Sequence, residues 1–396
     1  MDYQISEQMQ QKLQRIDDFL KTHIIPLEPL LLTGQWPTLM ENLNGLRKKV
    51  QEMGLWAANL PKDVGGSYTT LVDLALIAEV LGQSPLGHYV FGCQAPDAGN
   101  AELLHLHGTE EQIEHWLKPL AAGKIRSCFA MTEPHTAGSN PTLLDATAVL
   151  DGDEWVINGR KWFTTSAEGA SFTVAMVVTD PDAEKHSRAS MILVPLDNPG
   201  YRLIRNIPVM GHKGYGYFSH GEVEFTDCRV PASNLLGKRG QGFALAQERL
   251  GPGRIQHCMR WLGIGKRSLN EMCRYVKSRK ISSTQTLADQ QLMQAMIADS
   301  TAEIAAARAL VLETAWTVEN LGFKAARENI SLIKFYTANI LQRVVDRALQ
   351  SHGALGMTDD TILAHFYREE RAARIYDGPD EVHRLSVARK ILKQTV

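Results

Sequence analysis

The stretch Ala148-Val149-Leu150-Asp151-Gly152-Asp153-Glu154-Trp155-Val156-Ile157 decides the fold class of this chain. Two apolar, β-branched runs flank a glycine-containing turn, a pattern that predicts a β-hairpin. Asn158-Gly159 predicts a second turn directly after it. Residues 173–178, 190–194 and 221–225 are further short runs rich in β-branched residues. The sequence therefore predicts a compact all-β domain over residues 126–236.

Both flanks of this domain carry helical periodicity instead. Upstream, Leu13, Ile16, Leu20 and Ile24 recur at helical spacing. Downstream, apolar residues recur from 304 to 318 and from 330 to 348, and Gly251-Pro252-Gly253 is expected to interrupt or kink an earlier helix. We therefore predict a mainly α chain with an inserted β-domain: an N-terminal helical domain (1–125), a central β-barrel or sandwich (126–236) and a C-terminal four-helix bundle (237–396).

Composition excludes several classes of function. The 396 residues are 44% hydrophobic with a net charge of −2, which gives no electrostatic footprint for nucleic acid or an anionic membrane. No apolar run approaches membrane-spanning length. The five cysteines are odd in number and far apart, and no Cys or His spacing suits a metal. We therefore expect no bound metal. Since Met1-Asp2-Tyr3-Gln4 lacks a basic, apolar leader, we expect a cytoplasmic protein.

Near the C-terminus, Arg374-Ile375-Tyr376-Asp377-Gly378-Pro379-Asp380-Glu381-Val382-His383-Arg384 combines a turn with a helix start. Pro379 is predicted as the first helical residue, with acidic side chains in the first turn and one apolar face formed by Val382, Leu385, Ala388 and Leu392. Asp377 is then a carboxylate on a glycine-hinged turn, suited to reach into a cavity. The alternative is that Asp377 only caps the helix.

Three motifs add a family resemblance. They are residues 128–139 (CFAMTEPHTAGS), 158–165 (NGRKWFTT) and 229–237 (RVPASNLLG). All three resemble signatures of the acyl-CoA dehydrogenase family, in the family's order, and the resemblance runs from about residue 10 to the end. Residues 93–100 and 249–254 are most similar to the branch whose animal members carry an additional kinase-like domain, which we do not expect here.

The resemblance implies an FAD site, because a flavin needs hydrogen-bond donors near N5 and its pyrimidine edge. The residues implied in FAD binding within the β-domain are Phe129, Met131, Thr132, Ser139, Phe163 and Thr165, with Ser139 also meeting the pantetheine arm of the substrate. Pro379 and Glu381 are implied from the C-terminal helix. Arg279, Gln350 and Gly353 resemble residues that reach a neighbouring subunit's FAD, which implies a homo-oligomer, commonly a homotetramer built as a dimer of dimers. Ser282-Ser283 departs from the family's pattern there.

The catalytic base is assigned by the same resemblance. Most members place glutamate where Asp377 stands, and another group places the base at the position of Gly253, which cannot serve. Asp377 is therefore the expected base, and Arg254 and Gly378 are expected at the substrate. Glu248 is a second candidate, although a helix-surface position is favoured for it. His257 and Cys258 are adjacent and do not share a helical face, which disfavours a Cys–His dyad.

The function implied is FAD-dependent oxidation of an acyl-CoA to the trans-2-enoyl-CoA, as in fatty acid β-oxidation. Asp377 would take the α-proton while the β-hydrogen leaves as hydride to flavin N5, and electrons would pass to an electron-transfer flavoprotein. Two alternatives remain: a flavin oxidase on the same fold, of the acyl-CoA oxidase or nitroalkane type, and a binding or assembly protein that has lost catalysis. An unrelated helical scaffold would require three ordered motif matches to be accidental.

Overall fold

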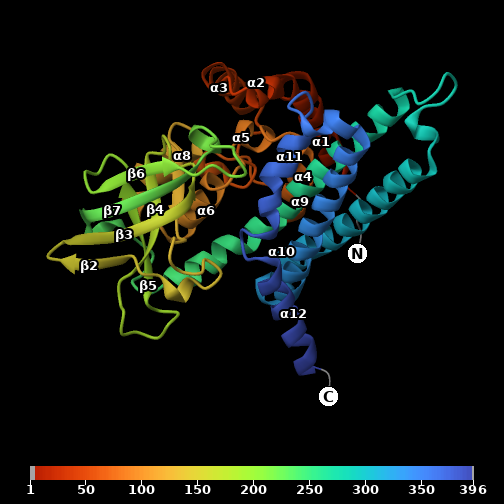
Figure 1. Cartoon of the computed structure of the whole chain (residues 1–396). Helices are drawn as coiled ribbons and strands as arrows, with labels where there is room; N and C mark the ends of the chain where they lie inside the picture. Colours follow the sequence, from red (N-terminus) through yellow and green to blue (C-terminus); the bar gives the residue numbers. More distant parts are fainter. Residues whose placement is uncertain (1–4, 395–396) are drawn as a thin grey trace. The chain divides into compact units, whose positions relative to one another are not determined.

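The computed structural model describes residues 5–394, and the four N-terminal residues on which the expectation of no leader rests lie outside them. The predicted mainly helical chain with an inserted β-domain is confirmed (Figure 1). The chain divides into two compact units that do not follow chain order. A helical unit contains residues 5–53, 69–90 and 251–394, and a β-containing unit contains residues 54–68 and 91–250.

The helical unit combines long and short helices, two of which begin with a side-chain cap. Ser6 accepts the Met9 N–H at the first of them, and Thr70 accepts the Asp73 N–H at another. None of the helices within residues 5–394 is long and apolar enough to cross a membrane. The helices of this unit are α1 (Glu7–Phe19), α2 (Glu28–Leu32), α3 (Trp36–Glu52), α4 (Leu71–Leu81), α5 (Gly87–Val90), α9 (Gly242–Ser278) from residue 251 on, α10 (Gln291–His352), α11 (Leu363–Glu370) and α12 (Asp380–Gln394).

The two longest helices, α9 and α10, each contain a residue that normally disrupts a helix. Pro252 lies inside α9 and the helix continues past it, so the helix is not interrupted there, and the expected alternative of a kink stays a prediction. In α10, Gly322 has φ 81° and ψ 165°, so two helical segments meet at a kink. These segments correspond to the two periodic stretches predicted around residues 304–318 and 330–348.

Helices α4 and α9 approach closely at glycines. A Cβ at Gly263 would lie 2.2 Å from the Glu79 carbonyl oxygen, and one at Gly82 would lie 2.3 Å from the Arg260 carbonyl oxygen. Because the obstructing atoms are backbone, they cannot swing aside as a flexible side chain would. The contact therefore fixes the position of α9, which carries Arg254, His257 and Arg260.

We expect Gly263→Ala to lower the free energy of unfolding by about 1–3 kcal/mol, because the two helices must separate to admit the methyl group. Urea unfolding followed by circular dichroism measures this. Gly265→Ala is the matched control, since its nearest heavy atom would be Ile304 Cδ1 at 3.6 Å, an ordinary contact. Equal stability of the two variants would contradict the backbone obstruction.

The β-containing unit is an eight-stranded sheet with short helices beside it. Its main path runs β6-β7-β3-β2-β4-β5-β8, and β1 pairs in parallel with β4. The strands are β1 (Ser127–Ala130), β2 (Thr147–Asp151), β3 (Glu154–Thr165), β4 (Phe172–Val178), β5 (Ala189–Pro195), β6 (Tyr201–Asn206), β7 (His220–Pro231) and β8 (Leu235–Leu236). The helices are α6 (Asp97–His107), α7 (Glu110–Gln112) and α8 (Lys118–Ala121).

The predicted hairpin is confirmed. β2 pairs antiparallel with β3, and Asp151 stands opposite Glu154 across the two-residue Gly152-Asp153 loop. The predicted second turn at Asn158-Gly159 is wrong, because β3 continues to Thr165 and the pairing with β7 shifts there as a β-bulge. Gly159 has φ 141° and a Cβ on it would lie 2.5 Å from the Ala146 Cβ, so this glycine allows a close approach inside the sheet.

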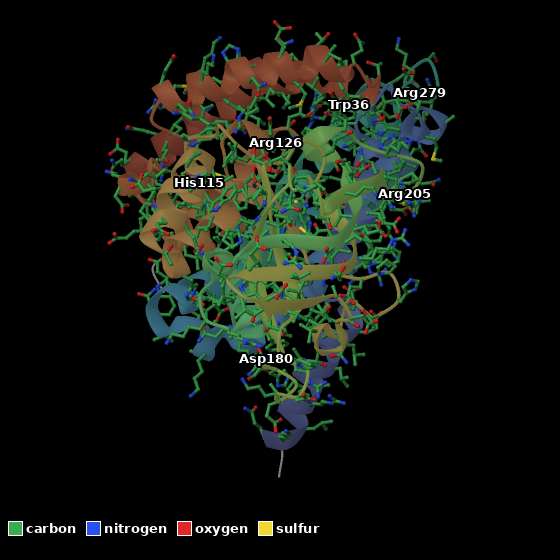
Figure 2. The ribbon with its side chains drawn as sticks, turned by 90° about the vertical axis from the view of Figure 1, so that its left-hand side faces the viewer. Trp36, His115, Arg126, Asp180, Arg205 and Arg279 are labelled. Carbon is green, nitrogen blue, oxygen red and sulfur yellow. The ribbon has the colours of Figure 1, made fainter. Side chains whose placement is uncertain are left out.

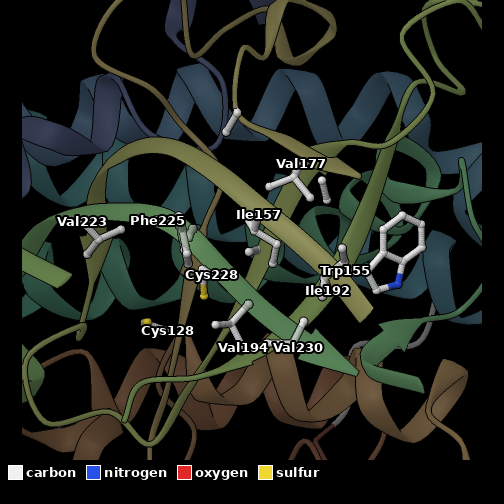
Figure 3. Packing of buried hydrophobic residues seen from close by; sticks show 14 of the residues in the cluster. Cys128, Trp155, Ile157, Val177, Ile192, Val194, Val223, Phe225, Cys228 and Val230 are labelled. Carbon is white, nitrogen blue, oxygen red and sulfur yellow. The ribbon is translucent and has the colours of Figure 1, made fainter. Parts of the chain in front are cut away.

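Buried side chains from most strands form the core of this unit (Figure 3). Trp155 and Ile157 of β3 pack with Val177 of β4, Ile192 of β5 and Phe225 of β7. Cys128 and Cys228 also lie in this core, and all five cysteines of the chain are free. Because Cys128 and Ala130 of β1 face this core, the Phe129 side chain between them points to the opposite face of the strand.

Candidate functional site

Asp377 lies on a strained turn of the helical unit, between Arg374 and the start of α12. Asp377 has φ 55° and Gly378 has φ 99°, so two successive residues adopt left-handed backbone conformations. For aspartate this conformation costs about 1–2 kcal/mol, and it persists only where surrounding contacts hold it. At Gly378 a Cβ would lie 2.7 Å from His383 Nε2, so a side chain there would displace that ring.

The helix after the turn begins one residue later than predicted. α12 starts at Asp380, and the Pro379 carbonyl accepts the N–H groups of Val382 and His383 at 3.0 and 3.4 Å. Pro379 therefore precedes the first helical residue. The predicted apolar face is also exposed within this chain, with Leu385 and Leu392 on the surface, while the buried residues of the helix are Asp380, His383 and Val387.

Three side chains hold Asp377 at both its backbone and its carboxylate. Arg254 Nε donates to the Asp377 carbonyl at 3.0 Å, and His383 Nε2 contacts the same oxygen at 3.1 Å. His257 Nε2 lies 3.3 Å from Asp377 Oδ2. Within residues 5–394 no N–H of α12 donates to this carboxylate, so the alternative in which Asp377 caps the helix is not observed.

A network of polar side chains packs against the turn that contains Asp377. The Tyr376 hydroxyl accepts from Arg260 at 2.8 Å and from Trp261 Nε1 at 2.9 Å, and Arg260 makes a bidentate pair with Glu370 at 2.5 and 2.9 Å. Burial raises the pKa of Tyr376 well above its usual range, although Arg260 acts in the opposite direction. The phenol therefore stays neutral and serves as a fixed polar contact beside Asp377.

Lys334 of α10 is fully buried next to the same turn. Its Nζ donates to the Ala373 carbonyl at 2.7 Å, and burial lowers its pKa to about 8 although Asp377 and Asp380 favour the charged form. Asp380 is itself buried and accepts from Arg374 Nε and Asn339 Nδ2, both at 2.8 Å. Sequence reasoning missed Lys334 because a lysine in a periodic helix usually lies on the solvated face.

The residues expected near a flavin ring lie together in the β-containing unit. The Thr132 hydroxyl donates to the Trp162 carbonyl at 2.8 Å, and the Thr132 carbonyl accepts the Trp162 N–H at 3.0 Å. The Thr132 amide N–H has no protein acceptor among residues 5–394. Phe163 has φ 48°, and the residue is 45% exposed. The Thr165 hydroxyl lies 2.9 Å from His220 Nδ1. A free backbone donor, an exposed aromatic ring and nearby hydroxyls fit a flavin.

The same segment is anchored by a buried ion pair that sequence reasoning did not find. Lys161 Nζ lies 2.7 Å from Glu133 Oε1 and donates to the Met131 carbonyl at 2.9 Å. Glu133 also accepts the amide N–H groups of Asp145 and Ala146 at 2.7 and 2.9 Å. Burial acts to raise the pKa of Glu133, but Lys161 and these amides outweigh it and hold the pKa below its usual range.

The remaining predicted residues are found as follows. Phe129 lies under the Arg249 guanidinium, 4.3 Å from its ring centroid, and Ser139 is exposed in the loop after β1. Glu248 pairs with His107 at 2.9 Å on the surface, which is the kind of position expected for it. The exposed predicted residues of the helical unit are Arg279 just after α9 (Figure 2), Gln350 in the last turn of α10, Gly353 after it and Glu381 in the first turn of α12.

Family models match almost the whole chain. The N-terminal, middle and C-terminal domains of acyl-CoA dehydrogenase match residues 6–124, 128–228 and 240–392. The chain therefore belongs to the acyl-CoA dehydrogenase family, whose members are FAD-dependent flavoproteins. The donors around Thr132 and Phe163 are of the kind that this cofactor requires.

Individual relatives agree with this assignment. The chain is 41% identical to "Probable acyl-CoA dehydrogenase FadE2" of Mycobacterium tuberculosis over 100% of its own length and 98% of that protein. It is also 41% identical to mouse acyl-CoA dehydrogenase family member 10 over 98% of its length, but it spans only 37% of that longer protein. A solved structure of a candidate acyl-CoA dehydrogenase from Mycobacterium abscessus is 37% identical, with a TM-score of 0.94 and full coverage of both chains.

Proposed function

We propose that this protein is an FAD-dependent acyl-CoA dehydrogenase that converts an acyl-CoA thioester to its trans-2-enoyl-CoA, with Asp377 as the base. The observation that carries the proposal is the left-handed turn at Asp377, whose backbone is held by Arg254 and His383 and whose carboxylate lies beside His257. Strained backbone conformations of this kind persist mainly at functional sites.

Asp377 would act through its second carboxylate oxygen. Oδ2 faces His257, and Oδ1 accepts no hydrogen bond from residues 5–394, which leaves it available to receive a proton. A general base must come within about 2.6–3.2 Å of its partner atom. Aspartate is one methylene shorter than the glutamate of most members. The contacts of Arg254 and His383 with the Asp377 backbone carbonyl set how far the backbone extends toward the substrate.

The chain's own residues would also prepare the substrate. An α-proton beside a thioester is too weakly acidic for a carboxylate unless the carbonyl is polarised as the enolate develops. We assign this role to the Asp377 backbone N–H, with Arg254 and Gly378 beside the thioester. Partial burial of the Asp377 side chain, 19% exposed, limits competition from water.

FAD would be held by Phe129, Met131, Thr132, Ser139, Phe163 and Thr165, with Pro379 and Glu381 contributing from the end of the helical unit. When bound, FAD supplies the acceptor for the β-hydrogen of the substrate. Family members often pass electrons to an electron-transfer flavoprotein, and we propose the same acceptor here. A cytoplasmic location and a role in fatty acid β-oxidation stay predictions.

Anaerobic titration of the yellow holoprotein with a panel of acyl-CoAs tests the function. At least one member of the panel should bleach the flavin absorbance, and the reduced protein should be reoxidised faster by an electron-transfer flavoprotein than by dissolved oxygen. Rapid reoxidation by oxygen would instead identify a flavin oxidase. Failure of every acyl-CoA to bleach a fully loaded protein would favour the binding or assembly alternative.

We further propose that Arg279, Gln350 and Gly353 reach the FAD of a neighbouring subunit in a homotetramer. Arg279 is exposed, and its guanidinium has no partner within the described part of this chain, residues 5–394. The planar, permanently charged guanidinium group of arginine suits the diphosphate of FAD. Analytical ultracentrifugation of the holoprotein tests the tetramer, and a monomer with full FAD occupancy would contradict it.

Arg279→Ala should weaken FAD binding about 10- to 100-fold, the usual effect of losing a hydrogen bond to a charged group. Fluorescence titration of the apoprotein with FAD measures the dissociation constant. Lys280→Ala is the matched control, because Lys280 is an adjacent exposed cation outside the predicted contact set. Equal losses in the two variants would show that only general surface charge is involved.

A further inference from the structure

His257 forms a pair with the proposed base, although no sequence feature indicated it. Its Nε2 lies 3.3 Å from Asp377 Oδ2, and the two side chains are 22% and 19% exposed. The spacing of residues along α9 explains why His257 faces Asp377. His257 and Trp261 follow Arg254 by three and seven residues on α9, so all three project from one face of the helix toward the turn.

The imidazole is held in one orientation by aromatic neighbours. It stacks on Trp261 with a centroid distance of 6.1 Å and an interplanar angle of 20°, and it meets the edge of Tyr376 at 5.3 Å. Tyr376 is in turn fixed through its hydroxyl by Arg260 and Trp261. A ring restrained in this way keeps Nε2 directed at one carboxylate oxygen.

We propose that His257 is a positioning residue for Asp377, that the charge of each side chain acts on the other, and that His257 accepts the proton which Asp377 takes from the substrate. The inference rests on the proposed function of Asp377 as base. When the substrate C–H bond breaks, its electron pair stays on the substrate and the proton forms an O–H bond at Asp377. Rotation of the carboxyl group brings the new O–H, formed at Oδ1, to His257 Nε2. Transfer of the proton then restores the carboxylate and leaves an imidazolium that releases the proton to solvent.

The coupling has a definite sign. A protonated His257 cannot accept the proton that Asp377 removes from the substrate, whereas a neutral His257 can. The rate of proton abstraction should therefore rise as pH increases through the ionisation of His257. Conversely, removal of the Asp377 charge should make His257 easier to deprotonate.

Other charged or titratable groups surround the pair and must be separated from it. They are Arg254, Cys258 and Arg260 on α9, His88 on α5, Lys334 on α10, Glu370 on α11, Tyr376 in the turn, and Asp380 and His383 on α12. Burial, followed by Arg260 and His257, holds the pKa of His88 well below its usual range. Burial, followed by Arg254, lowers the pKa of His383 to about 4. Burial lowers the pKa of Lys334 to about 8, so this lysine is a further group to be separated from the pair.

Histidine titration by NMR tests the coupling without requiring turnover. The holoprotein is labelled with ¹³C-histidine, and the His257 signal is assigned by its absence from His257→Gln. In Asp377→Asn the midpoint of His257 should fall by about one pH unit or more, because an opposite charge within a few ångströms is lost. Exposed His23 is the internal control and should not move. An unchanged His257 midpoint in Asp377→Asn overturns the proposal.

Stopped-flow flavin reduction supplies the second measurement. The wild-type rate should rise with pH around the His257 midpoint that the NMR titration measures, and His257→Gln should lose that inflection. A merely structural role would scale the rate equally at every pH, and that result contradicts the proposal. If no acyl-CoA reduces the wild-type flavin, the proposed function fails, while the NMR titration still decides whether the pair is coupled.

Discussion

Asp377→Asn should lower the rate of flavin reduction by an acyl-CoA about 10²- to 10⁴-fold, the usual contribution of a positioned general base. Asparagine keeps the size of the side chain and tolerates the left-handed backbone of the turn. The contacts from Arg254 and His383 to the carbonyl of residue 377 do not depend on the carboxylate. The variant should therefore fold, bind FAD and stay yellow, and anaerobic stopped-flow absorbance measures the loss.

Glu248→Gln is the matched control for this experiment. Glu248 was the second candidate base, but its carboxylate pairs with His107 on a surface. We expect Glu248→Gln to reduce its flavin at the wild-type rate. Near-wild-type reduction by Asp377→Asn, together with loss of reduction in Glu248→Gln, would move the base to Glu248.

Glu133→Ala should lower the free energy of unfolding by about 3–5 kcal/mol, the usual effect of leaving a buried charge without its partner. Lys161 has no exposed surface and Glu133 is 4% exposed at the side chain, so water cannot replace the lost carboxylate. The amides of Asp145 and Ala146 would lose their acceptor as well. Because Lys161 also holds the Met131 carbonyl, the variant should bind FAD more weakly.

Urea unfolding with flavin and tryptophan fluorescence measures both effects. Glu224→Ala is the control, because Glu224 pairs with Arg202 at 2.6 Å on the exposed surface of the same sheet and should contribute far less. The pKa of Glu133 is depressed in the folded protein, so its contribution is present above the unfolded pKa and is lost as pH falls through the folded value. Wild type and Glu133→Ala should therefore converge in stability at acidic pH. A constant difference down to acidic pH would contradict the ion-pair explanation.

Local features of the sequence predicted those parts of the fold that depend on nearest neighbours. The hairpin at Gly152-Asp153 follows from turn chemistry and alternating burial, both of which act over a few residues. The same reasoning failed at Asn158-Gly159, where Gly159 admits Ala146, the residue just before the paired strand β2. Of the interruption or kink expected at Pro252, the interruption does not occur, since the lost hydrogen bond of a proline can be tolerated inside a helix as long as α9.

The sequence by itself determined that Asp377 would stand on a glycine-hinged turn before a helix, and its motifs indicated the family that comparison with known proteins confirms. Only the tertiary structure decided which groups face that carboxylate. His257 and buried Lys334 come from distant segments, and Glu133 meets Lys161 across 28 residues. The physical reason is that the ionisation of a side chain depends on charges and burial within a few ångströms, and these distances are set by packing between segments that sequence spacing does not bring together.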